Sequence, residues 1–574
     1  MLSKSGKMSS HPAVRFQQIP VVEGKLSSFD RIRGTIVDDV VSETMRELTG
    51  SDLDLVLGQA LYSERFRLKH FKGNIYTRSR SKRDRALWNR VQAGLLRPSA
   101  EVDREQLLSG VVRHFGEEIA GHFDPRVYRF ASHAVPWGVS WLLNAASVRR
   151  FLPWGMTESL ASRLHILGEV TALQRLAERG TILLVPTHQS NIDSILIGYV
   201  IYLLSLPPFA YGAGINLYSN PVLNFFMSHL GAYTVDRQKG NEIYKTALKN
   251  YSTRLLREGV HSIFFPGGGR SRSGAVESKL KLGLLGTGLQ AQIQGYLSGA
   301  KFPNVYVVPM VMSYHFVLEA GSLIEDYLAE AGRHRYIMMD DESWQPIKVL
   351  RFFWKLFSAQ TAITVRIGKP LDIFGNFVDE EGRSIGPNGR IIDPRLWLST
   401  KGELRSDPQR DREYTRELGN RLIDRFHREN TVLTSHVVAF AFFEALRRRY
   451  PDLDVFRFLR LSISQRSLPY DEFTQAAAQV RERLVMSEGR GELHLSPELK
   501  TADTEKWVRD GIGQLGCLHG AGVIRESDGV VWTEDMNLLY YYRNRLSGYG
   551  LSLLAESEGP NRMPGENDSK GFLA

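Results

Sequence analysis

The stretch TILLVPTHQSNID, residues 181–193, decides how the fold is interpreted. It begins with an apolar run of the length of a buried strand, passes through polar residues, and leads into an apolar helical segment from Ser194 onward. Similar short strands are predicted at 165–170, 231–237, 260–268, 305–314 and 362–371, with helices at 171–180 and 241–259. Alternation of strands and helices predicts an α/β domain, whose ligands bind beyond the carboxyl ends of the strands.

The regions on either side of this domain have helical patterns of apolar residues. We divide the chain into a helical N-terminal region (1–125), a candidate interfacial helical segment (126–160), the α/β domain (161–375), a helical C-terminal domain (405–556) and a disordered tail (557–574). A chain of 574 residues is too long for one compact core, which agrees with several domains.

The composition favours anionic partners and a reducing compartment. The formal net charge of +10 suits nucleic acid, anionic lipid or phosphorylated substrates, although ordinary soluble proteins can be equally basic. The single cysteine, Cys517, excludes a disulfide within the chain and a cysteine-based metal site. We find no secretory signal pattern, and no apolar run of the roughly 20 residues that a spanning helix needs. The sequence therefore predicts no transmembrane helix.

Two segments have features of membrane-surface elements. Residues 131–148 are apolar, have arginines on both sides, and have Trp137, Trp141 and Trp154 in or beside them. Residues 78–90 hold six basic side chains, which would suit anionic headgroups. The alternatives are a buried packing helix for the first segment and a solvated helix face for the second.

His188 and Asp193 are candidates for a catalytic pair. The histidine follows a predicted strand, and the aspartate opens the next helix, so the chain must turn between them. Such a turn lets the carboxylate accept a hydrogen bond from one imidazole nitrogen while the other faces a substrate. The alternative is a helix-capping aspartate beside an unrelated histidine.

Two further predicted strands lead into arginine. The segment FPGGGRSR (265–272) carries three glycines followed by Arg270 and Arg272, and the strand at 231–237 ends at Arg237. Glycines let backbone N–H groups approach an anion closely, and arginine adds charge-assisted bonds to phosphate oxygens. The spacing does not match a nucleotide P-loop. The alternative is a plain glycine turn with surface arginines.

Taken in their order along the chain, these sequence motifs resemble those of the glycerol-3-phosphate/dihydroxyacetone-phosphate acyltransferase family. The resemblance is in particular to its large bacterial glycerol-3-phosphate acyltransferases. The family's H-x-x-x-x-D block is similar to 188–193, and its glycine-to-arginine block to 231–237. Its F-[PV]-E-G-[GT]-R-S-R block is similar to 265–272, and its proline-containing apolar strand to 305–314. The stretches AGINLY, KGNEIY, LTSHVVAFAFF and NLLYYYRNRL extend the resemblance, which covers 164–554 and leaves the N-terminal third unplaced.

The resemblance implies a fold and an activity. The expected fold is α/β, an acyltransferase domain with a central mixed sheet flanked by helices, plus helical N-terminal and C-terminal regions. The expected reaction moves a fatty acyl group from acyl-CoA or acyl carrier protein to the 1-hydroxyl of sn-glycerol 3-phosphate, the first step of phospholipid synthesis. Dihydroxyacetone phosphate and lysophosphatidate remain alternative acceptors.

The resemblance also implies roles for site residues. His188 is the expected general base, and Asp193 orients it. The turn is formed by Gly267, Gly268 and Gly269. The expected phosphate-binding residues are Arg237, Arg270, Ser271, Arg272 and Lys281.

We expect no metal and no cofactor besides the acyl thioester as co-substrate. The expected partners are the acyl donor, glycerol 3-phosphate and an anionic membrane surface, with no nucleic acid. The expected location is peripheral, on the cytoplasmic face of a bacterial inner membrane. The uncharged stretch 194–235 is interpreted either as an acyl-chain groove or as ordinary core.

Gly267 departs from the family pattern, which has glutamate at this position. The missing carboxylate would orient an arginine or the site backbone. Two outcomes follow: the protein is a weakened, acyltransferase-like membrane or acyl-carrier-binding protein, or a water or another acid replaces the lost group. The sequence does not decide between them.

Overall fold

The computed structural model describes residues 22–70, 75–98, 102–132, 163–215, 221–332, 362–400, 402–501, 503–515, 519 and 522–552. Most of the candidate interfacial segment 126–160, the tail 557–574 and Cys517 lie outside these residues.

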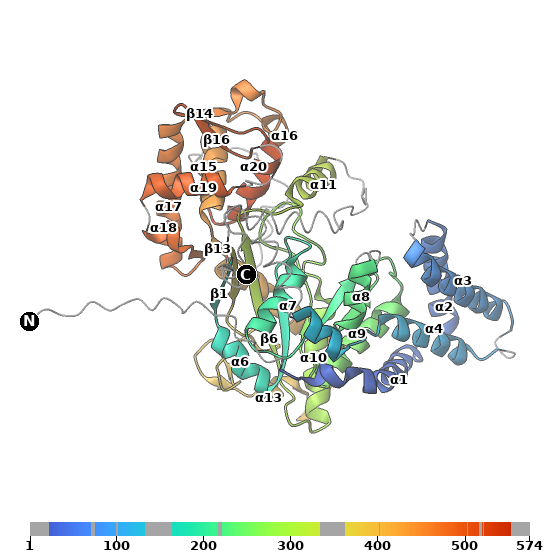
Figure 1. Cartoon of the computed structure of the whole chain (residues 1–574). Coiled ribbons are helices and arrows are strands. Elements are labelled where there is room, and N and C mark those ends of the chain that lie inside the picture. Colours follow the sequence, from blue (N-terminus) through green and yellow to red (C-terminus); the bar gives the residue numbers. More distant parts are fainter. Residues whose placement is uncertain are drawn as a thin grey trace, which may run out of the picture.

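A seven-stranded mixed sheet forms the centre of the molecule (Figure 1). Its strands are β1 (Leu164–Gly168), β2 (Thr181–Pro186), β3 (Ala210–Gly214), β4 (Ala232–Val235), β5 (Ser262–Ile263), β6 (Val305–Tyr314) and β7 (Ile363–Ile367). The order is β1-β7-β6-β2-β5-β3-β4, and only the β6–β7 pairing is antiparallel. The predicted fold class is confirmed, and β3 is the strand that the sequence missed.

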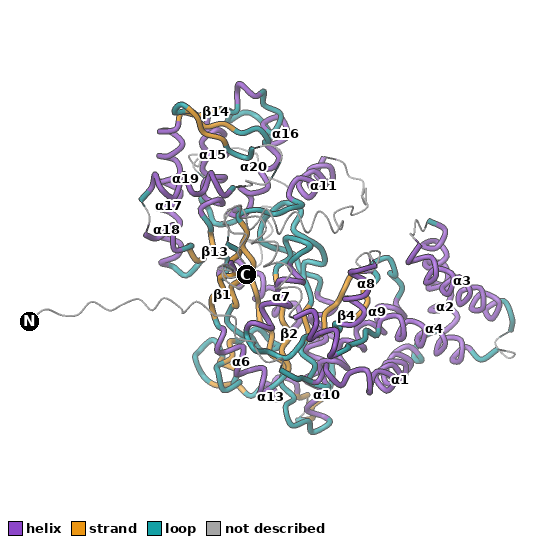
Figure 2. Tube along the Cα trace, viewed as in Figure 1, coloured by secondary structure: helices purple, strands orange, loops and turns teal. Residues whose placement is uncertain are grey.

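Helices cover both faces of the sheet (Figure 2). They are α6 (Val170–Arg179), α7 (Asp193–Leu203), α8 (Pro221–His229), α9 (Glu242–Arg257) and α10 (Leu282–Leu297). Helix α11 (Ala320–Gly332) packs instead on α20 (Met536–Arg543) of the C-terminal region. Every residue of β2 is buried, and its side chains alternate between two cores. Ile182 and Leu184 pack in the core with α6 and α7, whereas Leu183 and Val185 pack in the core with α10.

The N-terminal region is a helical unit that packs on α9. It contains α1 (Phe29–Leu48), α2 (Leu53–Lys69), α3 (Ile75–Leu95) and α4 (Arg104–Ile119), after a short turn η1 (Lys25–Ser28). Its core is continuous with that of α9, where the rings of Phe115 and Tyr244 meet edge to face with centroids 5.3 Å apart. Figure 1 shows these helices on the side of the sheet away from the C-terminal helices.

A buried ion network joins the N-terminal region to the loop between β4 and α9. The Lys239 ammonium lies 3.3 Å from Asp84, pairs with Glu118, and has no solvent exposure. Asp84 also pairs with Arg67 at 2.5 Å and with the His114 ring at 2.8 Å. Asp84, His114 and Glu118 lie close enough together to suggest a metal site, but the Lys239 ammonium already supplies the positive charge there.

The C-terminal region is mainly helical. Its longer helices are α14 (Pro408–Arg428), α15 (Thr434–Arg448), α17 (Tyr470–Gly489), α19 (Thr504–Gln514) and α20 (Met536–Arg543). Helix α14 packs on α10, and α15 lies in the same core as β6, so this region is continuous with the α/β core. The domain boundaries stay a prediction.

Short elements complete the structure. They are α13 (Pro394–Leu398), α16 (Val455–Phe458), α18 (Pro497–Thr501), η4 (Ile463–Gln465), η5 (Asn544–Leu546), β8 (Phe377–Val378), β9 (Ser384–Ile385), β10 (Ile391–Ile392), β11 (Ser399–Thr400), β12 (Glu403–Leu404), β13 (Thr431–Val432), β14 (Ser467–Pro469), β15 (His494–Leu495), β16 (Arg525–Ser527) and β17 (Val530–Trp532).

The uncharged stretch 194–235 supplies core in its first part. Leu196, Ile197, Val200 and Ile201 of α7 are buried in the main core, so the core interpretation holds for this helix. Among the helices that the structure describes, none combines the length and the apolar character that crossing a membrane requires.

Replacing Lys239 with methionine should destabilise the protein. The change leaves the Asp84 and Glu118 carboxylates buried without their ammonium, which typically costs about 3–5 kcal/mol. Urea unfolding measures this loss. The control is Lys245→Met on the exposed face of α9, which should change stability by less than about 0.5 kcal/mol. Equal stability of the two variants would contradict a structural role for the network.

Candidate active site

The chain segments singled out in the sequence meet at the carboxyl ends of β2, β4 and β5. We call residues 187–192, after β2, the histidine loop, and 267–272, after β5, the glycine loop. The Ser271 N–H donates to the His188 carbonyl oxygen at 2.7 Å, so the two loops lie against each other. Arg237 reaches the same place from β4, because its Nη1 lies 3.9 Å from where a Cβ at Gly269 would be.

His188 and Asp193 form a hydrogen-bonded pair. The Nδ1 atom of the imidazole lies 2.9 Å from Oδ2 of Asp193, as the turn between them had suggested. The ring packs on Phe265 with ring centroids 4.1 Å apart, and its side chain is 17% exposed. Its other nitrogen, Nε2, has no hydrogen-bond partner in the part of the chain that the structure describes. The imidazole is therefore fixed at one nitrogen and accessible at the other.

Asp193 has no solvent exposure and is met by several donors. Its Oδ2 accepts from the backbone N–H of Gln189 at 2.7 Å and of Ser190 at 3.0 Å, and its Oδ1 accepts from the Tyr314 hydroxyl. Burial and the neighbouring carboxylate raise the pKa of Tyr314 well above its usual value, so this hydroxyl remains a donor. Tyr314 is the last residue of β6, and the sequence did not single it out.

The glycine loop is shaped by one glycine and by the C-terminal region. Gly268 alone among its three glycines has a left-handed backbone, with φ of 72°, and the Lys281 side chain lies across it. The Ser271 hydroxyl donates to the Ala275 carbonyl at 2.7 Å. From the C-terminal region, the Asn544 side chain donates to the Ser273 carbonyl at 3.0 Å. The loop is thus held from both sides.

The predicted phosphate-binding side chains differ in their surroundings. Arg237 and Lys281 are exposed, and neither has an ion-pair partner among the described residues. Arg270 is mostly buried, with its guanidinium 3.6 Å from Glu319. Arg272 is exposed and pairs with Glu330 at 2.7 Å. The structure therefore brings Arg237 and Lys281 to the glycine loop, beside its own Arg270. Arg272 of the same loop instead pairs with Glu330 of α11.

Glu319 links an arginine to the histidine loop. Its carboxylate accepts from the Ser190 hydroxyl at 2.9 Å and from the Asn191 N–H at 3.1 Å, besides pairing with Arg270. Burial raises the pKa of Glu319, and Arg270 acts against that rise. The sequence missed this residue, because it lies immediately before α11, more than a hundred residues from the loop it holds.

Glu277 is a second acid that the sequence missed. Its Oε1 accepts from the backbone N–H of His188 at 2.6 Å, and its Oε2 is buried without a hydrogen-bond partner. Burial raises the pKa of Glu277 to about 7, against the lowering effect of the bond from His188. Arg545 also lowers it, from η5 in the C-terminal region.

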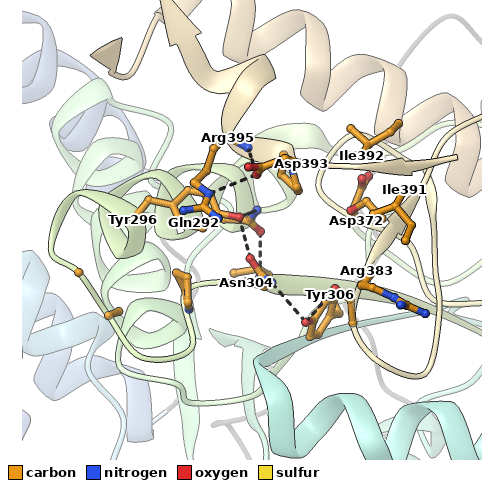
Figure 3. A pocket seen from close by; sticks show the side chains of 17 residues that line it. Gln292, Tyr296, Asn304, Tyr306, Asp372, Arg383, Ile391, Ile392, Asp393 and Arg395 are labelled. Atoms are coloured by element: carbon orange, nitrogen blue, oxygen red, sulfur yellow. Dashed lines mark hydrogen bonds and ion pairs between the residues drawn. The ribbon is translucent and has the colours of Figure 1, made fainter. Parts of the chain in front are cut away.

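A cavity of about 470 Å³ opens at the other end of the sheet (Figure 3). Its wall includes a chain of hydrogen bonds from Gln292 through Tyr296 to Asn304, next to the start of β6. Strands β2 and β6 run parallel from this end toward His188, so the cavity lies at their amino ends. Its lining contains no histidine, so it lacks an imidazole that could act as a base.

Residues 168–313 match the protein-family model described as Acyltransferase. This match covers the histidine loop, β4, the glycine loop and almost all of β6. The central part of the chain is therefore an acyltransferase domain.

More particularly, the chain is similar to bacterial glycerol-3-phosphate acyltransferases. It is 24% identical to the protein of that name from Pseudomonas fluorescens, over 79% of this chain and 46% of the relative. It is 25% identical to that from Pseudomonas syringae pv. syringae, over 88% of this chain and 53% of the relative. The protein from Haemophilus influenzae is 32% identical over 31% of this chain and 21% of its own length. The chain spans about half the length of the Pseudomonas relatives.

Glu277→Gln should flatten the pH dependence of stability. The carboxyl group has a raised pKa in the folded state, so it favours folding while protonated, and this contribution is lost as pH rises from about 4.5 to about 7. The free energy of unfolding of the unchanged protein should fall relative to that of the variant, by on the order of 3 kcal/mol across this window. Chemical denaturation at a series of pH values measures the difference. A constant difference would show that this carboxyl does not titrate there.

Proposed function

We propose that this protein is a glycerol-3-phosphate acyltransferase, which transfers a fatty acyl group from a thioester to the 1-hydroxyl of sn-glycerol 3-phosphate. The observation that carries the proposal is the His188–Asp193 pair, with its free Nε2, beside the glycine loop and Arg237. The similarity to proteins named glycerol-3-phosphate acyltransferase supports the choice of acceptor. Dihydroxyacetone phosphate and lysophosphatidate are the alternative acceptors, because each also carries a phosphate.

In the proposed reaction His188 acts as a general base. The Nε2 atom takes the proton of the acceptor hydroxyl as the oxygen attacks the thioester carbonyl carbon. The carbon–sulfur bond then breaks, and the imidazolium returns the proton to the leaving thiolate. Asp193 holds the tautomer that leaves Nε2 unprotonated and stabilises the imidazolium, as the bond at Nδ1 requires. The acyl group passes directly between substrates, without an acyl-enzyme.

The phosphate of the acceptor is placed at the glycine loop. Arg237 and Lys281 approach this loop with their charges unpaired among the described residues, so binding a phosphate there breaks no ion pair of theirs. Arg270 lies next to them but keeps Glu319 as a partner. Holding the phosphate a few bonds from the hydroxyl orients the nucleophile toward Nε2. Acyl-CoA or acyl carrier protein serves as co-substrate, and the reaction as proposed needs no other cofactor.

We further propose that the protein binds an anionic membrane surface from the cytoplasmic side. Helix α2 supports this with an exposed face that we call the α2 patch, made of Leu55, Tyr62, Arg65, Phe66 and Lys69. Tyr62 is 76% exposed and Phe66 61%. Exposed aromatic rings next to basic side chains suit the boundary between headgroups and acyl chains.

An acyltransfer assay tests the activity. The purified chain is offered glycerol 3-phosphate, dihydroxyacetone phosphate and 1-acylglycerol 3-phosphate, each with acyl-CoA and with acyl carrier protein, in the presence of lipid. We expect turnover of glycerol 3-phosphate, a loss in kcat of about 10²–10⁴-fold in His188→Ala, and a raised KM for the acceptor alone in Arg237→Met.

The control for the assay is His165→Ala, which changes an exposed histidine on β1 and should leave turnover intact. Turnover that survives in His188→Ala would exclude His188 as the base. Absence of turnover in the unchanged protein with every donor and acceptor would contradict the proposed activity.

Membrane binding is tested with the double variant Tyr62→Ser/Phe66→Ser. Cosedimentation with vesicles containing phosphatidylglycerol should weaken at least about tenfold, because two apolar side chains no longer enter the lipid. Vesicles of phosphatidylcholine alone should bind less of the unchanged protein. The control Phe302→Ser removes another exposed ring, between α10 and β6, and should bind like the unchanged protein. Equal binding of all variants would contradict a role for the α2 patch.

A further inference from the structure

Gly267 is not required to be glycine by its backbone. Of the three glycines in the loop, only Gly268 has a positive φ, so the conformation at 267 is open to other residues. What restricts position 267 is space. A Cβ built there would lie 3.2 Å from Cγ of Glu277 and 3.7 Å from its Oε1. The Glu277 carboxylate therefore fills the volume into which a side chain at 267 would extend.

We propose that Glu277 is the positioning residue of this active site, and that it supplies, from beyond the C-terminal end of the glycine loop, the carboxylate that position 267 lacks. The inference rests on the proposed acyltransferase function and deepens it. The sequence left open whether the protein is a weakened acyltransferase or whether another group replaces the carboxylate missing at 267. The geometry supports replacement by another acid.

The contacts of Glu277 show what it positions. Its Oε1 accepts the backbone N–H of His188, the residue whose ring is the proposed base, at 2.6 Å. The same side chain lies against the glycine loop at 267, so Glu277 is packed between the two loops. With its pKa raised to about 7, Glu277 is a charged acceptor at neutral to alkaline pH, and charged acceptors make the stronger class of hydrogen bond. The bond is shielded from water because Glu277 is only 9% exposed.

Besides accepting the bond from the His188 N–H, the Glu277 carboxylate is attracted by a buried guanidinium. Oε2 has no hydrogen-bond partner, and Nη1 of the buried Arg545 also has none, in the part of the chain that the structure describes. The two groups attract each other electrostatically, across more than hydrogen-bond distance. Two buried groups of opposite charge that are incompletely hydrogen-bonded cost the fold stability, so their retention is consistent with a role in the site. The role we infer is to keep the backbone of His188 in place.

Four variants test the proposal. Glu277→Ala should lower kcat about ten- to a hundredfold through loss of one charged hydrogen bond, with the acceptor KM nearly unchanged. Glu277→Gln, which keeps an acceptor oxygen, should retain more activity than Glu277→Ala. Gly267→Glu alone should also lose activity, because the added side chain meets Glu277 at 3.2 Å. The double variant Gly267→Glu/Glu277→Ala should recover activity, since the carboxylate returns from the other side of the same space.

Asp372→Ala is the matched control. It removes a carboxylate that is 3% exposed and lies at the opposite end of the sheet, so it should lower stability but leave kcat unchanged. Hydrogen exchange gives a readout that does not depend on turnover. The His188 amide should lose protection in Glu277→Ala, keep it in Asp372→Ala, and regain it in the double variant.

Two outcomes would overturn the proposal: full protection of the His188 amide in Glu277→Ala, or a double variant no better than Glu277→Ala in both readouts. Failure of the unchanged protein to turn over any substrate would count against the proposed function. The exchange measurement would still decide the role of Glu277.

Discussion

The candidate active site is organised around a carboxylate that water does not reach. Asp193 is fully buried, and a buried charge of this kind is tolerated only when donors surround it. Its donors come from the backbone of the histidine loop, from Tyr314 at the end of β6 and from the imidazole itself. Moving any of these elements would remove at least one hydrogen bond from a buried charge. The position of the imidazole is therefore coupled to the central sheet rather than to its own loop alone.

The C-terminal region is part of this arrangement. Arg545 has 2% exposure and donates to the carbonyl of Met312, two residues before Tyr314. Asn544 next to it holds the Ser273 carbonyl, and Gly274 lies so close to the Tyr541 carbonyl that a Cβ would come within 2.2 Å of it. The stretch NLLYYYRNRL, whose resemblance to the family was visible in the sequence, thus supports the glycine loop from outside the matched domain. Residues 168–313, which match the family model, contain the candidate site but depend on contacts from beyond that range.

The sequence predicted the parts of the fold whose signal is local. Six strands of the central sheet, the α/β class and the position of the histidine loop follow from short apolar runs that end in polar residues, whereas the mixed character of the sheet was implied by the family resemblance. Strand β3 was missed, because its sequence AYGAG has two glycines in five residues and lacks a β-branched side chain. Local sequence patterns also failed to identify part of the candidate site. No motif marks Glu277, Glu319 or Tyr314, and only their contacts in the folded structure connect them to the histidine loop.

Two residues that lie close in sequence illustrate how the site is assembled. Arg237 points to the glycine loop, whereas Lys239 turns into the N-terminal helices and pairs with Asp84 and Glu118. A buried ammonium with two carboxylates cannot shift without exposing a charge to a nonpolar interior. The loop that carries Arg237 is consequently tied to the N-terminal region, while the glycine loop it faces is tied to the C-terminal region. We place the phosphate between the Arg237 loop and the glycine loop. One side of this space is therefore held by the N-terminal region and the other by the C-terminal region. The proposed acceptor site is a property of the whole described chain, although its recognisable motifs lie in the middle.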